Sequence, residues 1–141
     1  MSTRILLIAS GLFMLALGLA ASFFPQEVLF YARMQPTNLG ILLVQATGAL
    51  YAGFGVVNWA ARGTLLGWEN NRPLALGNFL HFTMMTVALV KALIAGALNP
   101  TIAAFGLLYL LFAASFGRAL VTRPAPTPAR RPRQTWGGAG V

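Results

Sequence analysis

The amino-acid sequence predicts an all-α integral membrane protein, a bundle of four helices that each cross the bilayer. The chain of 141 residues is 57% hydrophobic and only 9% charged, whereas about a quarter of an ordinary soluble domain is charged. A soluble fold of this length could not bury so much apolar surface. A bilayer can, because about 20 apolar residues in a helix match its hydrocarbon core of about 30 Å. The apolar runs are too long for membrane strands of about 9–11 residues, and they lack strand alternation.

The expected helices cover about 5–24, 39–61, 74–97 and 101–121, and together they form a transmembrane domain over residues 1–121. A signal peptide competes with a helix for the first run. The run is longer than the 7–15 residues of a signal core, and its small residues lead into Phe23 and Phe24, a poor cleavage context. The sequence therefore favours a transmembrane helix there.

Two shorter stretches are expected to lie outside the spans. QEVLFYARMQ, between Pro25 and Pro36, is too short to cross and mixes apolar with charged residues. It predicts a periplasmic interfacial helix in the headgroup zone, or else an ordered loop over the bundle. The segment 122–141 is rich in Pro, Gly and Arg and predicts a disordered, basic cytoplasmic tail, because it cannot build a core.

The positive charge predicts the orientation. Ten basic residues oppose two acidic ones, and the net charge is +8. Most basic residues flank apolar runs or lie in the tail, so anionic lipids at the cytoplasmic face are the expected partners, and nucleic acid is not. With both termini inside, the cytoplasmic side has eight arginines and the outer loops only Arg33. The positive-inside rule thus predicts a multi-pass protein of a bacterial inner membrane with cytoplasmic termini.

No residue pattern indicates catalysis, a metal or a cofactor. Cysteine is absent, which excludes disulfides, thiolate chemistry and Cys-ligated metals. Glu69, between Arg62 and Arg72, is expected to be a solvated loop charge, because an acid catalyst usually has a paired base or metal. We therefore expect a protein that is not an enzyme.

The best polar constellation is Asn58 on the second helix with Asn78 and His81 on the third. Asn78 and His81 share a face, because residues three apart are neighbours on a helix. One interpretation is a hydrogen-bonded clasp that joins the two helices, with about 0.6–2 kcal/mol from each bond. The other is a ligand, proton or headgroup site, since an intramembrane ionisable residue suggests function. Haem or metal ligation would need a second copy of the single histidine.

A second set of polar residues is expected in the outer half: Lys91, Glu27, Gln45 and Tyr51. Lys91 can snorkel to the outer headgroups. It can instead pair with Glu27, bond to Gln45 and Tyr51, or hold an anionic substrate in a cavity. Candidates for contact with lipid headgroups are Arg72, Arg130, Arg131 and Arg133.

Helix packing in lipid depends on small residues that let backbones approach. Pairs at four-residue spacing occur in every expected helix: Gly18 with Ser22, Gly48 with Ala52, Ala88 with Ala92 and Gly96, and Ala113 with Gly117. These faces also make a homo-oligomer, or association with other membrane proteins, an expected form of partnership.

The stretches QATGALYAGFGVVNWAARG from Gln45 and RPLALGNFLHF from Arg72 resemble small four-helix bacterial inner-membrane proteins of the DoxX-like and domain-of-unknown-function type, over about 39–97. The resemblance implies topology and draws attention to Asn58, Arg72, Asn78 and His81. The leading hypothesis is an accessory or interaction subunit. The alternatives are a small-solute, proton or lipid carrier that uses His81, Asn78, Asn58 or Lys91, and a haem- or quinone-binding redox protein.

Overall fold

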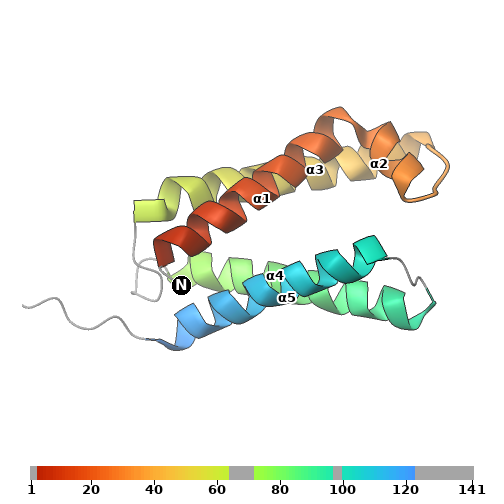
Figure 1. Cartoon of the computed structure of the whole chain (residues 1–141). Helices are drawn as coiled ribbons and strands as arrows, with labels where there is room; N and C mark the ends of the chain where they lie inside the picture. Colours follow the sequence, from red (N-terminus) through yellow and green to blue (C-terminus); the bar gives the residue numbers. More distant parts are fainter. Residues whose placement is uncertain (1–2, 64–71, 97–99, 123–141) are drawn as a thin grey trace, which may run out of the picture.

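The computed structural model describes residues 3–63, 72–96 and 100–122. Its helices are α1 (Thr3–Phe23), α2 (Pro25–Tyr31), α3 (Asn38–Ala60), the 3-10 turn η1 (Ala61–Gly63), α4 (Arg72–Ile94) and α5 (Pro100–Val121) (Figure 1). Four of them, α1, α3 with η1, α4 and α5, are long and apolar enough to cross a membrane. The predicted all-α class with four potential spans is confirmed. Of the predicted tail, all but Thr122 lies outside the described residues.

Local sequence signals set the helix ends. Pro25 occupies the first turn of α2, where its missing N–H is not needed. The Thr37 hydroxyl caps α3 by accepting a hydrogen bond from the Gly40 amide at 3.1 Å.

Arg33 ends α2 in the left-handed region with φ 57°. The amide of Arg33 donates to the Phe30 carbonyl and that of Met34 to the Leu29 carbonyl, the paired bonds of a Schellman motif. The stretch after Pro25 is therefore a short capped helix rather than an irregular loop.

The first pair of spans, α1 and α3, packs backbone against backbone. A Cβ atom added to Gly48 would lie 2.7 Å from the Ser22 amide nitrogen and 2.8 Å from the Gly18 carbonyl oxygen. One added to Gly55 would lie 2.7 Å from the Leu15 nitrogen and 2.9 Å from the Gly11 oxygen. Glycine is required at both places because a side chain would separate the helices. The predicted small faces of α1 and α3 meet one another.

The second pair, α4 and α5, packs through larger side chains. The Phe79 ring lies 3.1 Å from where a Cβ on Gly117 would be. The expected small-residue face of α4 is only partly covered by the described residues: Ala92 is half-buried, whereas Ala88 and Gly96 are exposed, and nothing described lies within 4 Å of a Cβ added to Gly96.

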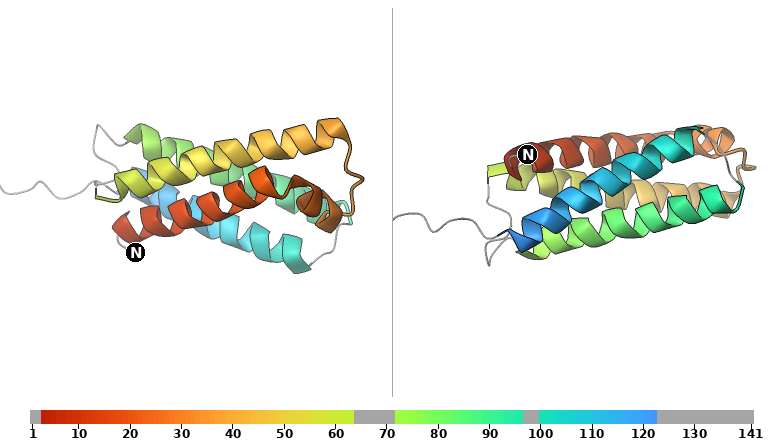
Figure 2. Two further views of the ribbon diagram at one scale, coloured as in Figure 1. Left: turned by 90° about the horizontal axis from the view of Figure 1, so that it is seen from above. Right: turned by 60° about the horizontal axis from the view of Figure 1, so that its bottom comes forward.

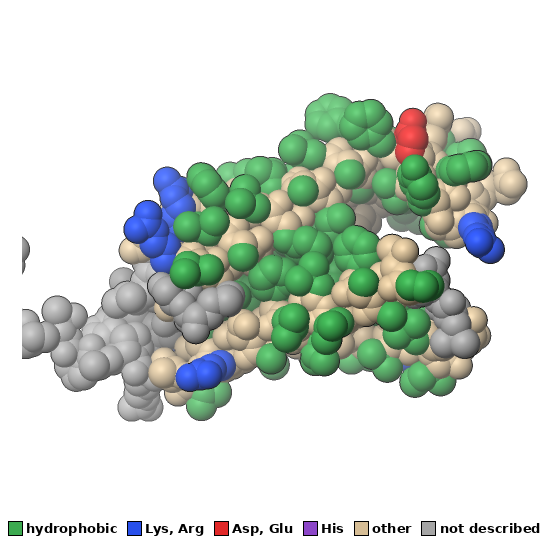
Figure 3. All heavy atoms as spheres, in the orientation of Figure 1, with side chains coloured by type: hydrophobic (Ala, Val, Ile, Leu, Met, Phe, Trp, Pro, Cys, Tyr) green, Lys and Arg blue, Asp and Glu red, His purple; other side chains and the backbone are tan. Residues whose placement is uncertain are grey.

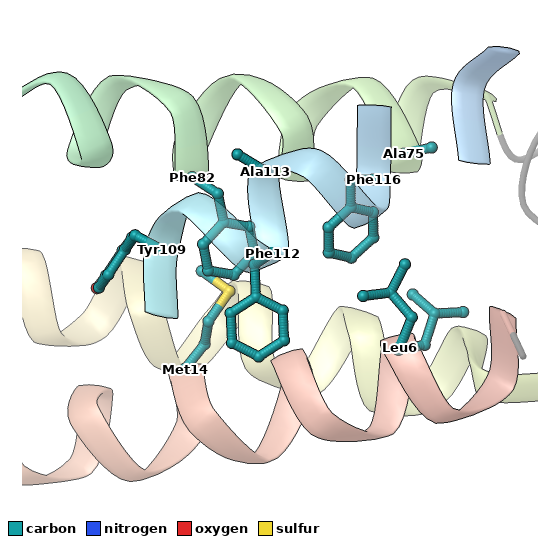
Figure 4. Close-up of a cluster of buried hydrophobic side chains, with 9 residues drawn as sticks. Leu6, Met14, Ala75, Phe82, Tyr109, Phe112, Ala113 and Phe116 are labelled. Carbon is teal, nitrogen blue, oxygen red and sulfur yellow. The ribbon is translucent and has the colours of Figure 1, made fainter. Parts of the chain in front are cut away.

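An aromatic core joins the α1–α3 pair to the α4–α5 pair, which we call the two hairpins. Leu6 and Met14 of α1 face Phe82 of α4 and Phe112 and Phe116 of α5 (Figure 4). The Phe82 ring stacks on Phe112 at 4.8 Å and on Phe116 at 5.8 Å between centroids. Side chains, rather than backbones, therefore separate one hairpin from the other.

The hairpins diverge toward the end that carries α2. Figure 1 shows α1–α3 and α4–α5 closest at the N-terminal end of α1, and Figure 2 shows the same four long helices from two further sides. In Figure 3 the surface is notched between the hairpins at the α2 end. We call the end where the hairpins are closest the closed end, and the half of the bundle beside it the closed half. The closed half contains the buried core residues of α4 and α5, from Ala75 to Phe82 and from Tyr109 to Phe116. The contacts that unite the hairpins are thus concentrated in one half of the bundle.

Candidate functional site

A pair of asparagines crosses between the hairpins inside the closed half. Each amide nitrogen donates to the other's carbonyl oxygen, Asn58 to Asn78 and Asn78 to Asn58, both at 2.7 Å. Both side chains are 0% exposed. Two reciprocal bonds satisfy a donor and an acceptor on each amide, which makes burial in an apolar bundle tolerable. The predicted clasp between the second and third spans exists for these two residues.

A third helix adds to the clasp. The Asn58 nitrogen also donates to the Ser10 hydroxyl of α1 at 3.2 Å, and that hydroxyl donates to the Leu7 carbonyl at 3.3 Å. The Asn78 nitrogen donates to the Leu74 carbonyl at 3.0 Å. The network therefore ties α1 and α3 to α4. We name Ser10, Asn58 and Asn78 the polar clasp.

His81 does not belong to the polar clasp. Its ring lies among four aromatic rings: Tyr51 at 4.8 Å, Phe82 at 5.2 Å, Phe54 at 6.0 Å and Tyr109 at 6.2 Å between centroids. Its Nε2 atom is buried and has no hydrogen-bond partner in the described part of the chain. The three-residue spacing from Asn78 is correct for a shared face, yet the imidazole reaches a separate aromatic site.

Tyr51 and Tyr109 close this aromatic site with a hydrogen bond between their hydroxyls at 2.9 Å. Tyr51 comes from α3 and Tyr109 from α5, so the bond is a second polar link between hairpins. Phe13 of α1 packs edge-on against the Tyr109 ring at 5.4 Å. We name Tyr51, His81 and Tyr109 the aromatic site.

The predicted outer-half set does not assemble. Lys91 is exposed, nine residues after the buried Phe82, which is about two and a half turns and places it on the opposite side of α4. No ion pair joins it to Glu27 among the described residues. Gln45 donates instead to the Ser22 carbonyl at 3.4 Å, and Tyr51 bonds to Tyr109. This geometry favours snorkelling of Lys91 over a substrate role.

Arginines gather at the closed end of the bundle, where α1 starts and α5 finishes: Arg4, Arg62, Arg72 and Arg118. Figure 3 shows basic groups there, with the acidic group and one basic group at the α2 end. The Arg62 guanidinium lies 4.7 Å from the centre of the Trp59 ring and donates to the Trp59 carbonyl at 2.8 Å. Glu69, Arg130, Arg131 and Arg133 lie outside the described residues.

The structure also identifies polar residues that the sequence reading missed. Ser10 and Tyr109 carried a usable signal, since each is a polar side chain near the middle of an apolar run. Their partners could not be known, because hydropathy does not reveal which helices are neighbours. In the described ranges, no group of three or more His, Cys, Asp and Glu side chains could hold a metal ion.

Comparisons with known proteins add no relative: no family model, curated protein or solved structure matches the chain.

Proposed function

We propose that this protein is a non-catalytic subunit that associates with other proteins, or with a second copy of itself, inside a membrane. The observation that carries the proposal is that the polar side chains inside the bundle form hydrogen bonds with one another. Ser10, Asn58 and Asn78 are fully buried and bond to one another, so they hold helices together instead of facing a substrate path. Of the three candidates Asn58, Asn78 and His81, only His81 would be left to bind the solute of a carrier.

The outward side of α3 supports association. Ala46, Gly53 and Ala60 are exposed there at seven-residue spacing, the same spacing that separates Gly11 from Gly18 and Gly48 from Gly55 in the α1–α3 contact. A Cβ on Gly53 would have nothing described within 4 Å. Small residues in a membrane helix permit close approach of another helix, so this side of α3 suits a partner helix.

For orientation, we propose that the arginine-rich end lies in the cytoplasm of a bacterial cell, beside anionic lipids. The α2 end then faces the periplasm. Exposed aromatic side chains on and beside α2, namely Phe23, Phe24, Phe30 and Tyr31, would lie at the outer headgroup level, where aromatic residues are favoured. Membership of the DoxX-like group remains a prediction.

Photo-crosslinking tests the proposed association. A photoreactive phenylalanine analogue at Leu50 or Val57, both exposed on α3, is expected to give protein adducts of defined mass in native membranes. The control is the same analogue at Leu111, exposed on α5, which is expected to give lipid adducts alone. Lipid adducts alone from α3 as well, or equal protein capture from both helices, would contradict an interface on α3.

A further inference from the structure

Two hydrogen-bonding groups of the aromatic site lack partners among the described residues. His81 Nε2 is buried and unbonded among the described residues. The bond between Tyr51 and Tyr109 uses one hydroxyl hydrogen as donor, and the hydrogen of the accepting hydroxyl is left over. No other hydrogen bond of either hydroxyl is formed with the described residues.

The surroundings offer these groups little compensation. The rings around His81 are those of Tyr51, Phe54, Phe82 and Tyr109. An N–H directed at the Tyr51 ring, whose plane is tilted by 78°, would be only a weak bond. A buried polar group without a partner destabilises the fold, because its lost hydrogen bonds to water are not replaced. Such a group in a native structure points to a bound water or ligand.

We propose that Tyr51, His81 and Tyr109 form an intramembrane binding site for a single hydroxyl group. One hydroxyl oxygen can accept the spare tyrosine hydrogen and donate to an unprotonated Nε2, so it satisfies both functions at once. A carboxylate or phosphate does not suit the site, because it would bring a charge into apolar surroundings. The site lies between three helices, α3, α4 and α5, and does not depend on the association proposed above.

Two sources can supply this chemistry. One is a trapped water, which small buried polar sites commonly hold. The other is the hydroxyl of a neutral lipid alcohol, which could approach from the notch between the hairpins seen in Figure 3.

Nuclear magnetic resonance can distinguish these sources, because His81 is the only histidine in the chain. Protein labelled with nitrogen-15 histidine would be placed in dioleoylphosphatidylcholine vesicles, with or without dioleoylglycerol. We expect magnetisation transfer to Nε2 from water in both preparations if the guest is water. We expect transfer from the glycerol protons, only where dioleoylglycerol is present, if the guest is a lipid alcohol.

Tyrosine variants test whether the magnetisation transfer depends on the hydroxyls of the aromatic site. Tyr51→Phe and Tyr109→Phe each leave one hydroxyl with a free hydrogen, so the double variant, which has neither hydroxyl, is expected to abolish the transfer and shift the Nε2 resonance. Tyr31→Phe is the matched control, since Tyr31 is 85% exposed on α2, and it should leave both unchanged. Absence of transfer from either source in the wild-type protein would overturn the proposal. So would transfer that persists in the double variant.

Discussion

Replacing Gly48 by leucine is expected to separate α1 from α3 and to lower the free energy of unfolding strongly. A Cβ there would already lie 2.6 Å from the Ser22 hydroxyl and 2.7 Å from its amide nitrogen, and backbone cannot rotate away as a side chain can. Overpacking costs about 1–3 kcal/mol in ordinary cores, and we expect Gly48→Ala to fall in that range and Gly48→Leu to exceed it. Reversible unfolding in mixed detergent micelles measures both.

Gly53 provides the control on the same helix. It has open space around it, and alanine favours a helix over glycine by about 1 kcal/mol. Gly53→Ala should therefore be neutral or stabilising in detergent, and Gly53→Leu nearly neutral. Equal losses at Gly48 and Gly53 would show that close contact with α1 does not determine the effect.

Breaking the polar clasp is the second change with a large expected effect. Asn58→Leu leaves the Asn78 carbonyl oxygen without its donor, and Asn78→Leu leaves the Asn58 oxygen in the same state. A buried group left unpaired costs about 1–3 kcal/mol, so each single variant should lose stability on that scale. The double variant should lose less than the sum, because neither orphan remains.

A double-mutant cycle measures this coupling. We expect a coupling free energy of about 0.6–2 kcal/mol, the range for hydrogen bonds between membrane helices. Gln45→Leu is the control, because Gln45 is exposed and its bond to Ser22 is long, 3.4 Å. Strict additivity of Asn58→Leu and Asn78→Leu would mean that the two amides do not stabilise the bundle through each other.

The sequence was sufficient to predict the four long helices and part of the polar clasp. Long apolar runs bounded by Pro, Arg and aromatic residues are strong signals, because the bilayer thickness sets their length. Asn58 and Asn78 were predictable partners, since polar groups in lipid must find one another. The reading failed for His81, because a three-residue spacing gives a shared face but says nothing about which neighbour each side chain meets.

Tertiary geometry explains the other differences. The pairing of Lys91 with Glu27 was inferred from their expected depth in the membrane, yet Lys91 lies on the side of α4 away from Phe82. The contact of Gly11 with Gly55 follows from the antiparallel alignment of α1 and α3, which no spacing within a single helix reveals. Tyr109 meets Tyr51 because α5 and α3 belong to different hairpins that face each other.

Single-cysteine labelling tests the four-span arrangement most directly, and the absence of native cysteine makes it clean. Cysteine would replace Arg4 or Arg118 at the arginine-rich end, or Gln35 in the loop before α3. We predict that a membrane-impermeant maleimide labels Gln35→Cys in intact bacterial spheroplasts, and labels Arg4→Cys and Arg118→Cys only after lysis. If Arg4→Cys and Arg118→Cys react on opposite sides of the membrane, the chain does not cross four times.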